Sequence, residues 1–113
     1  MRSPAAPRSG PAPVFTALGD ETRLAIVSRI CGEGPLSIAE LTAGTGMSRQ
    51  AVSKHLGVLQ RAGVAEGRRR GREHIWRIRG ESLDAANRYL AQISGQWDDA
   101  LGRLRDMVET AGD

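Results

Sequence analysis

The stretch 37–63 constrains the fold most, because it predicts two short helices held close together by a glycine-rich turn. Ser37 and Glu40 have the spacing of a capping box, so a first helix is expected to begin there. The segment Gly44-Thr-Gly46 allows a sharp change of direction, and Ser48 is suited to cap a second helix. Gly63 marks the end of that helix.

The second helix has one apolar face and one polar face. Val52, Leu56 and Leu59 lie at i, i+4 and i+7, so they are expected to be buried. Two short helices joined by a glycine turn, the second beginning with long polar donors, form a helix-turn-helix motif whose second helix enters the major groove of DNA. The residues expected to contact DNA from this helix are Ser48, Arg49, Gln50, Ser53 and Lys54.

The next segment predicts a β-hairpin. Val64–Arg70 and Glu73–Arg79 read as two short strands around Gly71, the second with alternating side chains. A ribbon directly after a helix-turn-helix is a wing. Its arginines can follow phosphates or enter a narrow minor groove, and they are Arg68, Arg69, Arg70 and Arg72.

Positive charge is concentrated in the middle third of the chain. Residues 48–79 carry nine Lys or Arg and two acids, whereas residues 1–47 are balanced and residues 80–113 have a net charge of −4. This segregation favours binding of a polyanion by one surface. A solvated charged face is the alternative that charge alone leaves open.

The C-terminal segment predicts a long helix with one continuous apolar stripe. Leu83, Leu90, Trp97 and Leu104 recur every seventh residue, with Ala86, Ile93, Ala100 and Met107 between them. At 1.5 Å per residue the helix is about 40–45 Å long, and so much apolar edge needs a partner. The alternative is a helix that folds back on its own domain. The residues expected in a dimer interface are Phe15, Leu83, Leu90, Ile93, Trp97, Leu101, Leu104 and Met107.

The N-terminal part divides into a tail and two helices. Residues 1–13 contain four prolines and little to bury, so they are expected to be a disordered tail, followed by one domain over 14–110 and a tail at 111–113. A short helix is expected to start near Pro13. Asp20 then caps a helix with Leu24, Val27, Ile30 and Cys31 on an apolar stripe, which predicts that Cys31 is buried. A redox-sensing thiol is the alternative for Cys31.

Length and composition exclude several classes of protein. The 113 residues suffice for one ordinary domain, and the single cysteine excludes an intrachain disulfide and a multi-cysteine zinc site. We find neither a membrane-length apolar stretch nor a secretory signal, so a cytoplasmic location without membrane contact is expected. No phosphate loop or catalytic constellation is present, and we expect neither enzyme activity nor a cofactor.

Four stretches together resemble the ArsR/SmtB family of winged-helix repressors over roughly residues 15–108. They are Ala17-Leu-Gly-Asp-Glu-Thr-Arg-Leu24, Ser37-Ile-Ala-Glu-Leu41, Ser48-Arg-Gln-Ala-Val-Ser-Lys-His-Leu56 and Leu59-Gln-Arg-Ala-Gly-Val64, with the Arg-Gly-Arg wing behind them. The resemblance implies a homodimer, DNA recognition by the helix that begins at Ser48, and repression that is relieved when an effector alters the dimer. It also implies a packing role for His55.

The metal sites of that family do not carry over. Its paired cysteines fall where this chain has residues such as Leu41 and Ala43, and the last helix has no histidine. We therefore expect no metal site, as in the branch of the family that lacks one.

The expected fold is mainly α-helical with a small β-hairpin, a winged helix-turn-helix that dimerises through its terminal helices. The expected function is repression from an inverted-repeat operator in double-stranded DNA, with a small-molecule effector that the sequence does not name. A thiol-responsive regulator acting through Cys31, or a winged helix that contacts protein or RNA, are the alternatives.

Overall fold

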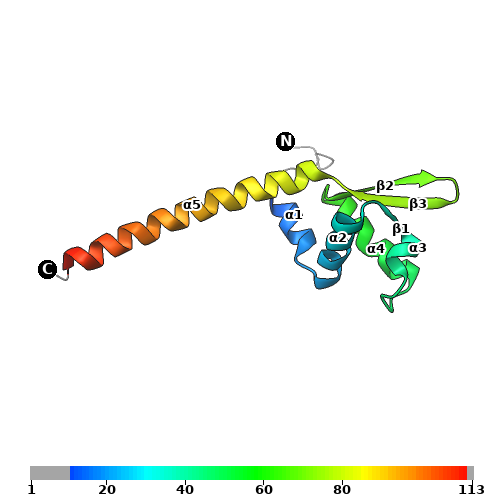
Figure 1. Cartoon of the computed structure of the whole chain (residues 1–113), viewed down its shortest axis with the longest axis horizontal. Helices are drawn as coiled ribbons and strands as arrows, with labels where there is room; N and C mark the ends of the chain where they lie inside the picture. Colours follow the sequence, from blue (N-terminus) through cyan, green and yellow to red (C-terminus); the bar gives the residue numbers. More distant parts are fainter. Residues whose placement is uncertain (1–10, 112–113) are drawn as a thin grey trace, which may run out of the picture.

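The computed structural model describes residues 11–111, which form five helices and three short strands (Figure 1). In chain order they are α1 (Pro11–Leu18), α2 (Glu21–Glu33), β1 (Leu36–Ser37), α3 (Ile38–Thr42), α4 (Arg49–Arg61), β2 (Ala65–Arg70), β3 (Glu73–Ile78) and α5 (Gly80–Ala111). Within this part of the chain, none of the helices has the length and apolarity needed to cross a membrane. The mainly helical fold with a small hairpin confirms the predicted fold class.

Three helices begin at side-chain caps that the sequence indicates. Asp20 accepts a hydrogen bond from the backbone nitrogen of Arg23 at 2.9 Å, at the start of α2. In α3 the capping box is complete, since Ser37 N donates to Glu40 Oε1 at 2.8 Å and Glu40 N donates to Ser37 Oγ at 3.1 Å. Each cap satisfies backbone donors that the first turn of a helix leaves without partners.

The sheet has the order β1-β3-β2, with both pairings antiparallel. β2 and β3 form the predicted hairpin, and Gly71 at its turn has a φ of 64°, a left-handed conformation that glycine adopts without strain. β1 was not predicted. Its two residues extend the hairpin, because Leu36 lies opposite Trp76 and Ser37 opposite Ile75.

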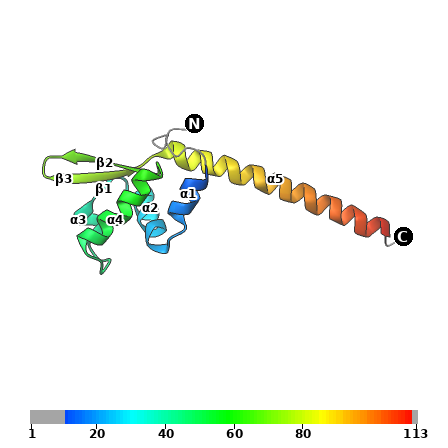
Figure 2. The same cartoon turned by 180° about the vertical axis from the view of Figure 1, so that it is seen from behind.

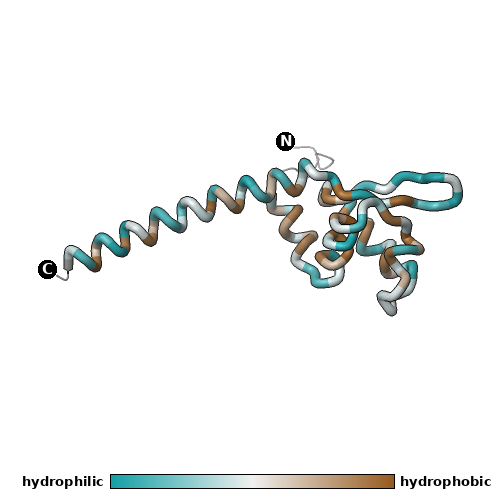
Figure 3. The backbone as a smooth tube through the Cα atoms, in the orientation of Figure 1, coloured by the Kyte–Doolittle hydropathy of each residue, from teal (hydrophilic) through white to brown (hydrophobic). Residues whose placement is uncertain are grey.

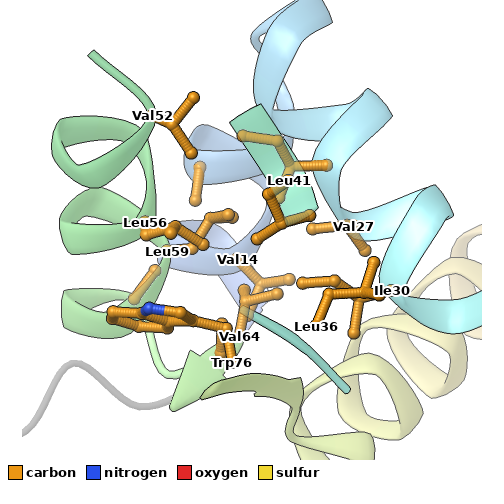
Figure 4. Close-up of a cluster of buried hydrophobic side chains, with 14 of the residues drawn as sticks. Val14, Val27, Ile30, Leu36, Leu41, Val52, Leu56, Leu59, Val64 and Trp76 are labelled. Carbon is orange, nitrogen blue, oxygen red and sulfur yellow. The ribbon is translucent and has the colours of Figure 1, made fainter. Parts of the chain in front are cut away.

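A single apolar core lies between the helices and the sheet. Leu56 and Leu59 of α4 are completely buried, as the helical spacing predicts. They pack with buried residues of α1, α2, α3 and β3, among which Val14, Ile30, Leu41 and Trp76 are labelled in Figure 4. Burial of this face fixes which side of α4 is left for solvent or a partner.

The prediction that Cys31 is buried is wrong. α2 turns Ile26, Val27 and Ile30 into the core, while Cys31 is exposed and the Leu24 side chain is 49% exposed. Residues 24 and 31 lie about 100° away from the centre of the buried face, because successive helical residues are offset by 100°.

α5 belongs partly to the domain and partly to its exterior. Near its start Ala86 is buried and Leu83 packs against the core, and the Tyr89 ring lies 6.1 Å from the Phe15 ring of α1. The helix then extends away from the end that carries the hairpin (Figures 1 and 2). The apolar residues that recur along it (Figure 3) remain exposed in the protomer, with Trp97 at 63% and Met107 at 68%.

The predicted boundaries of the domain are shifted by a few residues. α1 begins at Pro11, so residues 11–13 are helical rather than part of a tail, and Ala111 is still in α5. The predictions of disorder at residues 1–10 and of a tail at 112–113 lie outside the described residues.

Candidate nucleic-acid interface

The exposed face of α4 carries polar side chains at its N-terminal end. Ser48 is the N-cap, and its hydroxyl oxygen accepts a hydrogen bond from the backbone nitrogen of Ala51 at 3.1 Å. Because Val52, Leu56 and Leu59 are turned inward, the opposite face is open to solvent. The exposed residues of that face include Arg49, Gln50, Ser53 and Lys54. Their amide, hydroxyl and cationic groups match the hydrogen-bonding groups of base edges and phosphates.

The β2–β3 hairpin supplies a second set of cations. Arg68, Arg69, Arg70 and Arg72 are all exposed and lie at or beside the turn. Within residues 11–111, Arg69, Arg70 and Arg72 form no ion pair within 4 Å, and neither do Arg49 and Lys54. These five cations are therefore available to an external anion.

Glu66 reduces the positive charge at the base of the wing. Its carboxylate accepts a hydrogen bond from Arg77 Nε at 2.6 Å, and it lies 3.9 Å from Arg68 and 4.0 Å from Arg79. The bond from Arg77 lowers the pKa of Glu66, as do the charges of Arg77, Arg68 and Arg79, against a smaller opposing effect of partial burial. Glu66 is thus anionic at neutral pH and cancels part of the positive charge where the hairpin leaves the domain.

A polar cluster joins the start of α2 to α4. Arg23 Nε donates to the backbone oxygen of Ala17 at 2.7 Å, and Arg23 Nη1 lies 3.4 Å from His55 Nδ1. Asp20 lies 3.9 Å from the same histidine nitrogen, and its pKa is lowered chiefly by the hydrogen bond from the backbone of Arg23. A guanidinium can only donate, so this contact is a hydrogen bond in the tautomer whose Nδ1 is the acceptor. His55 is half-buried in this cluster, in keeping with the packing role expected for it.

The two predicted DNA-binding sets lie at one end of the molecule. The hairpin and the α3–α4 pair lie together, and the distal part of α5 is at the opposite end (Figures 1 and 2). Arg23, Glu66 and Arg77 were not predicted to contribute to this surface. The ion pair between Glu66 and Arg77 could have been predicted from the hairpin register, which places these two residues directly opposite each other.

Among the described residues, no group of three or more His, Cys, Asp or Glu side chains is arranged to hold a metal ion.

Comparison with known proteins assigns the fold to a family. Residues 18–68 match a family model described as a helix-turn-helix domain. The chain is 34% identical over 99 residues to the HTH-type transcriptional regulator Rv2034 of Mycobacterium tuberculosis, covering 88% of this chain and 89% of that protein. It superposes on an ArsR-like transcriptional regulator from Rhodococcus sp. RHA1 with a TM-score of 0.73 and 38% identity, covering 85% of this chain and 90% of the other.

The chain belongs to the ArsR family of winged helix-turn-helix transcriptional regulators. This confirms the resemblance drawn from the four sequence stretches. A further similar structure is the homodimeric winged helix-turn-helix DNA-binding domain Mb0332 of Mycobacterium bovis, with a TM-score of 0.58, 27% identity and 78% coverage of each chain. This ArsR-family protein is accordingly a transcriptional regulator with a helix-turn-helix DNA-binding domain. The family match covers α2 to α4 and the first part of β2, and leaves α5 outside.

Proposed function

We propose that this regulator binds double-stranded DNA as a homodimer on an inverted repeat and represses transcription there. It acts in the cytoplasm by binding and release, without catalysis. The N-terminal half of α4 reads base edges in the major groove, and the wing holds the flanking phosphates. Repression is the activity that the resemblance to the ArsR/SmtB repressors implies.

The observation that carries the proposal is the group of five unpaired cations at one end of the molecule. Arg49 and Lys54 lie on α4, and Arg69, Arg70 and Arg72 lie on the wing. Phosphate contacts give affinity without regard to sequence, whereas donors that reach base edges give specificity. Gln50 lies beside these cations on an exposed helix face, and its amide suits bidentate pairing with adenine. A surface for protein contacts would have fewer charged residues at its core.

The dimer is supported by the apolar stripe on α5. Beyond its first turns the helix exposes Leu90, Ile93, Trp97, Leu101, Leu104, Met107 and Val108. The heptad spacing of these residues is the pattern by which two helices pack together. The homodimeric state given for Mb0332 agrees with such an assembly. We assign the partner as a second copy of this chain, whose stripe has the same spacing.

The geometry of the dimer sets the form of the operator. Two protomers related by a two-fold axis present two α4 helices in opposite directions, so the DNA must contain an inverted repeat. Successive major grooves on one side of the duplex are about 34 Å apart, and we expect the half-site centres at about one helical turn.

The test is footprinting on the promoter region of the regulator's own gene, together with sedimentation of the free protein. We expect protection of two symmetric half-sites and a dimer at micromolar concentration. A single unpaired half-site, or a monomer in solution, contradicts the proposal.

A charge placed on the stripe tests the interface separately from the fold. Leu104 is 55% exposed in the protomer, so Leu104→Glu removes little packing from its own domain. We expect it to dissociate the dimer and weaken operator binding, with the helical circular dichroism of the winged domain retained. Gln92→Glu adds the same charge at an exposed position off the stripe and is expected to leave the dimer intact.

A further inference from the structure

A cavity of about 330 Å³ lies between α2 and the turn that joins α3 to α4. One wall is a single face of α2, lined by Glu21, Thr22, Ala25, Ile26 and Arg29. This volume is at the lower end of the range for small-molecule sites in proteins, which suits a compact ligand. None of the DNA-binding or dimer residues proposed above lines this cavity.

The floor of the cavity is apolar and belongs to the core. Ile26, Leu41 and Val52 line it, and each is buried. Thr45 and Met47 form the wall opposite α2, in the turn directly before the cap of α4. A ligand with an apolar body would therefore rest on the core and contact the turn that sets where α4 begins.

The charge at the rim decides which polar group such a ligand needs. The guanidinium of Arg29 is already engaged, since its Nε donates to Glu33 at 2.9 Å and its Nη1 reaches the backbone oxygen of Leu41 at 3.5 Å. The pKa of Glu40 is lowered mainly by hydrogen bonds from Ser37, and also by the charge of Arg29. Arg29 is thus already paired with Glu33, and its charge also acts on Glu40.

Glu21 is the second charged residue of the lining, and unlike Arg29 it has no ion-pair partner among the described residues. Its side chain is exposed, and within the part of the chain that the structure describes no cation lies within 4 Å of it. Glu21 and Arg29 are eight residues apart on one helix, which separates their backbones by about 12 Å along the axis. The charged group of the lining that has no ion pair among the described residues is therefore a carboxylate.

We infer that this cavity is a binding site for a small apolar cation, such as an aryl-alkyl ammonium compound. Its apolar body packs on Ile26, Leu41 and Val52, and its ammonium group pairs with Glu21 at the rim. The inference stands apart from DNA binding and goes beyond it, since the site faces α2 rather than the exposed side of α4.

The test compares two probes that differ in charge but share a ring and a two-carbon arm, 2-phenylethylammonium and 3-phenylpropanoate. Each is titrated into the ¹⁵N-labelled full chain and followed by amide chemical shifts. We expect the ammonium probe to shift Thr22, Ala25 and Met47 at millimolar concentration, and to bind more tightly than the carboxylate. Glu21→Gln should weaken its binding by up to about fivefold, the effect of losing one exposed charge pair.

Two controls make the outcome decisive. Glu109→Gln removes a carboxylate from the exposed end of α5, and ammonium binding should be unchanged. Ala25→Leu narrows the exposed mouth without a change in charge, and should weaken both probes. Tighter binding of the carboxylate, equal ammonium binding by Glu21→Gln, or no shift at these residues would each overturn the inference.

Discussion

Gly67 and Trp76 face each other across the β2–β3 ladder, with no room for a side chain between them. A Cβ atom built on Gly67 would lie 2.9 Å from the Trp76 ring and 2.6 Å from His74 Nε2. The rings of His74 and Trp76 are themselves in contact, with centroids 4.9 Å apart. Because Trp76 is buried in the core, it cannot move aside freely, and the base of the wing depends on this glycine.

Gly67→Ala is expected to destabilise the protein. The new methyl group must displace a packed tryptophan, and overpacking of this kind costs about 1–3 kcal/mol of the free energy of unfolding. Urea denaturation followed by tryptophan fluorescence measures the change. Gly95→Ala is the matched control, since nothing lies within 4 Å of its Cβ position in α5, and it should gain up to about 1 kcal/mol. Equal effects of the two substitutions would contradict the close approach of Gly67 and Trp76.

Gln50→Ala tests whether α4 reads bases. Loss of a good bidentate contact costs about 1–3 kcal/mol of binding free energy and relaxes sequence preference at one base pair. Fluorescence anisotropy with operator and scrambled duplexes separates the two effects. Gln60→Ala removes the same group from the exposed C-terminal turn of α4, and should leave both affinities unchanged. A Gln50 variant that loses affinity equally for both duplexes would place this residue on the phosphates instead.

Arg70→Ala tests the wing. An arginine on a phosphate adds affinity for any sequence, so we expect weaker binding to operator and scrambled DNA alike. The slope of log affinity against log salt should fall by about one for each phosphate that the variant no longer neutralises. Arg88→Ala is the control, because it removes an equal charge from α5, away from the hairpin. If the Arg70 variant keeps full affinity and salt slope, this arginine does not touch DNA.

Acid should lower the stability of the fold by protonating carboxylates at two helix caps and in the wing. The pKa values of Asp20, Glu40 and Glu66 are all lowered in the folded chain, by backbone hydrogen bonds in the first two and by Arg77 in the third. Their contribution to stability is complete above the pKa of the unfolded chain, and is lost as the pH falls through the folded pKa values. Thermal melts below about pH 5 should show a falling midpoint.

Glu40→Gln isolates one part of this pH dependence. The glutamine oxygen still accepts the hydrogen bond from Ser37 N, so the capping box survives at neutral pH, but the group no longer titrates. We expect a shallower loss of stability with acidification than in the wild type. An unchanged slope would remove Glu40 from the acid response.

We do not expect metal ions to release the protein from DNA. Zinc, cadmium, arsenite or copper at stoichiometric concentration should not release the operator, since a tight site needs three or four ligands held together. Anisotropy during metal titration measures release, with Cys31→Ser alongside. Because Cys31 is exposed, this substitution should change stability by no more than about 0.5 kcal/mol. Release at one metal per subunit that the serine variant abolishes would make Cys31 a ligand.

The helices and the wing could be predicted from local signals. Asp20, Ser37 and Ser48 have side-chain oxygens that cap a helix wherever the following residues allow one, so three starts were predicted correctly. The spacing of Val52, Leu56 and Leu59 likewise identified the buried face of α4.

The wrong or missing predictions concern features that local spacing does not determine. They depend on which face of a helix is buried, or on contacts between segments far apart in the sequence. On α2 the apolar residues cover a wide arc, and spacing alone did not show that Ile26 is buried while Leu24 and Cys31 are exposed. β1 has only two residues, too few for any alternation, and exists because β3 lies beside it. The contact of Arg23 with His55 spans 32 positions, so no local pattern indicates it.

In a paired assembly, the register between the two long α5 helices sets the distance between the two protomers. A slip of one heptad between two such helices moves the protomers by about 10 Å, at 1.5 Å per residue, and one base pair rises 3.4 Å. With α5 parallel to the DNA axis, a shift of one heptad would correspond to about three base pairs of half-site separation. In the dimer that we propose, the register between the two α5 stripes therefore helps to set the spacing of the half-sites that the two α4 helices fit.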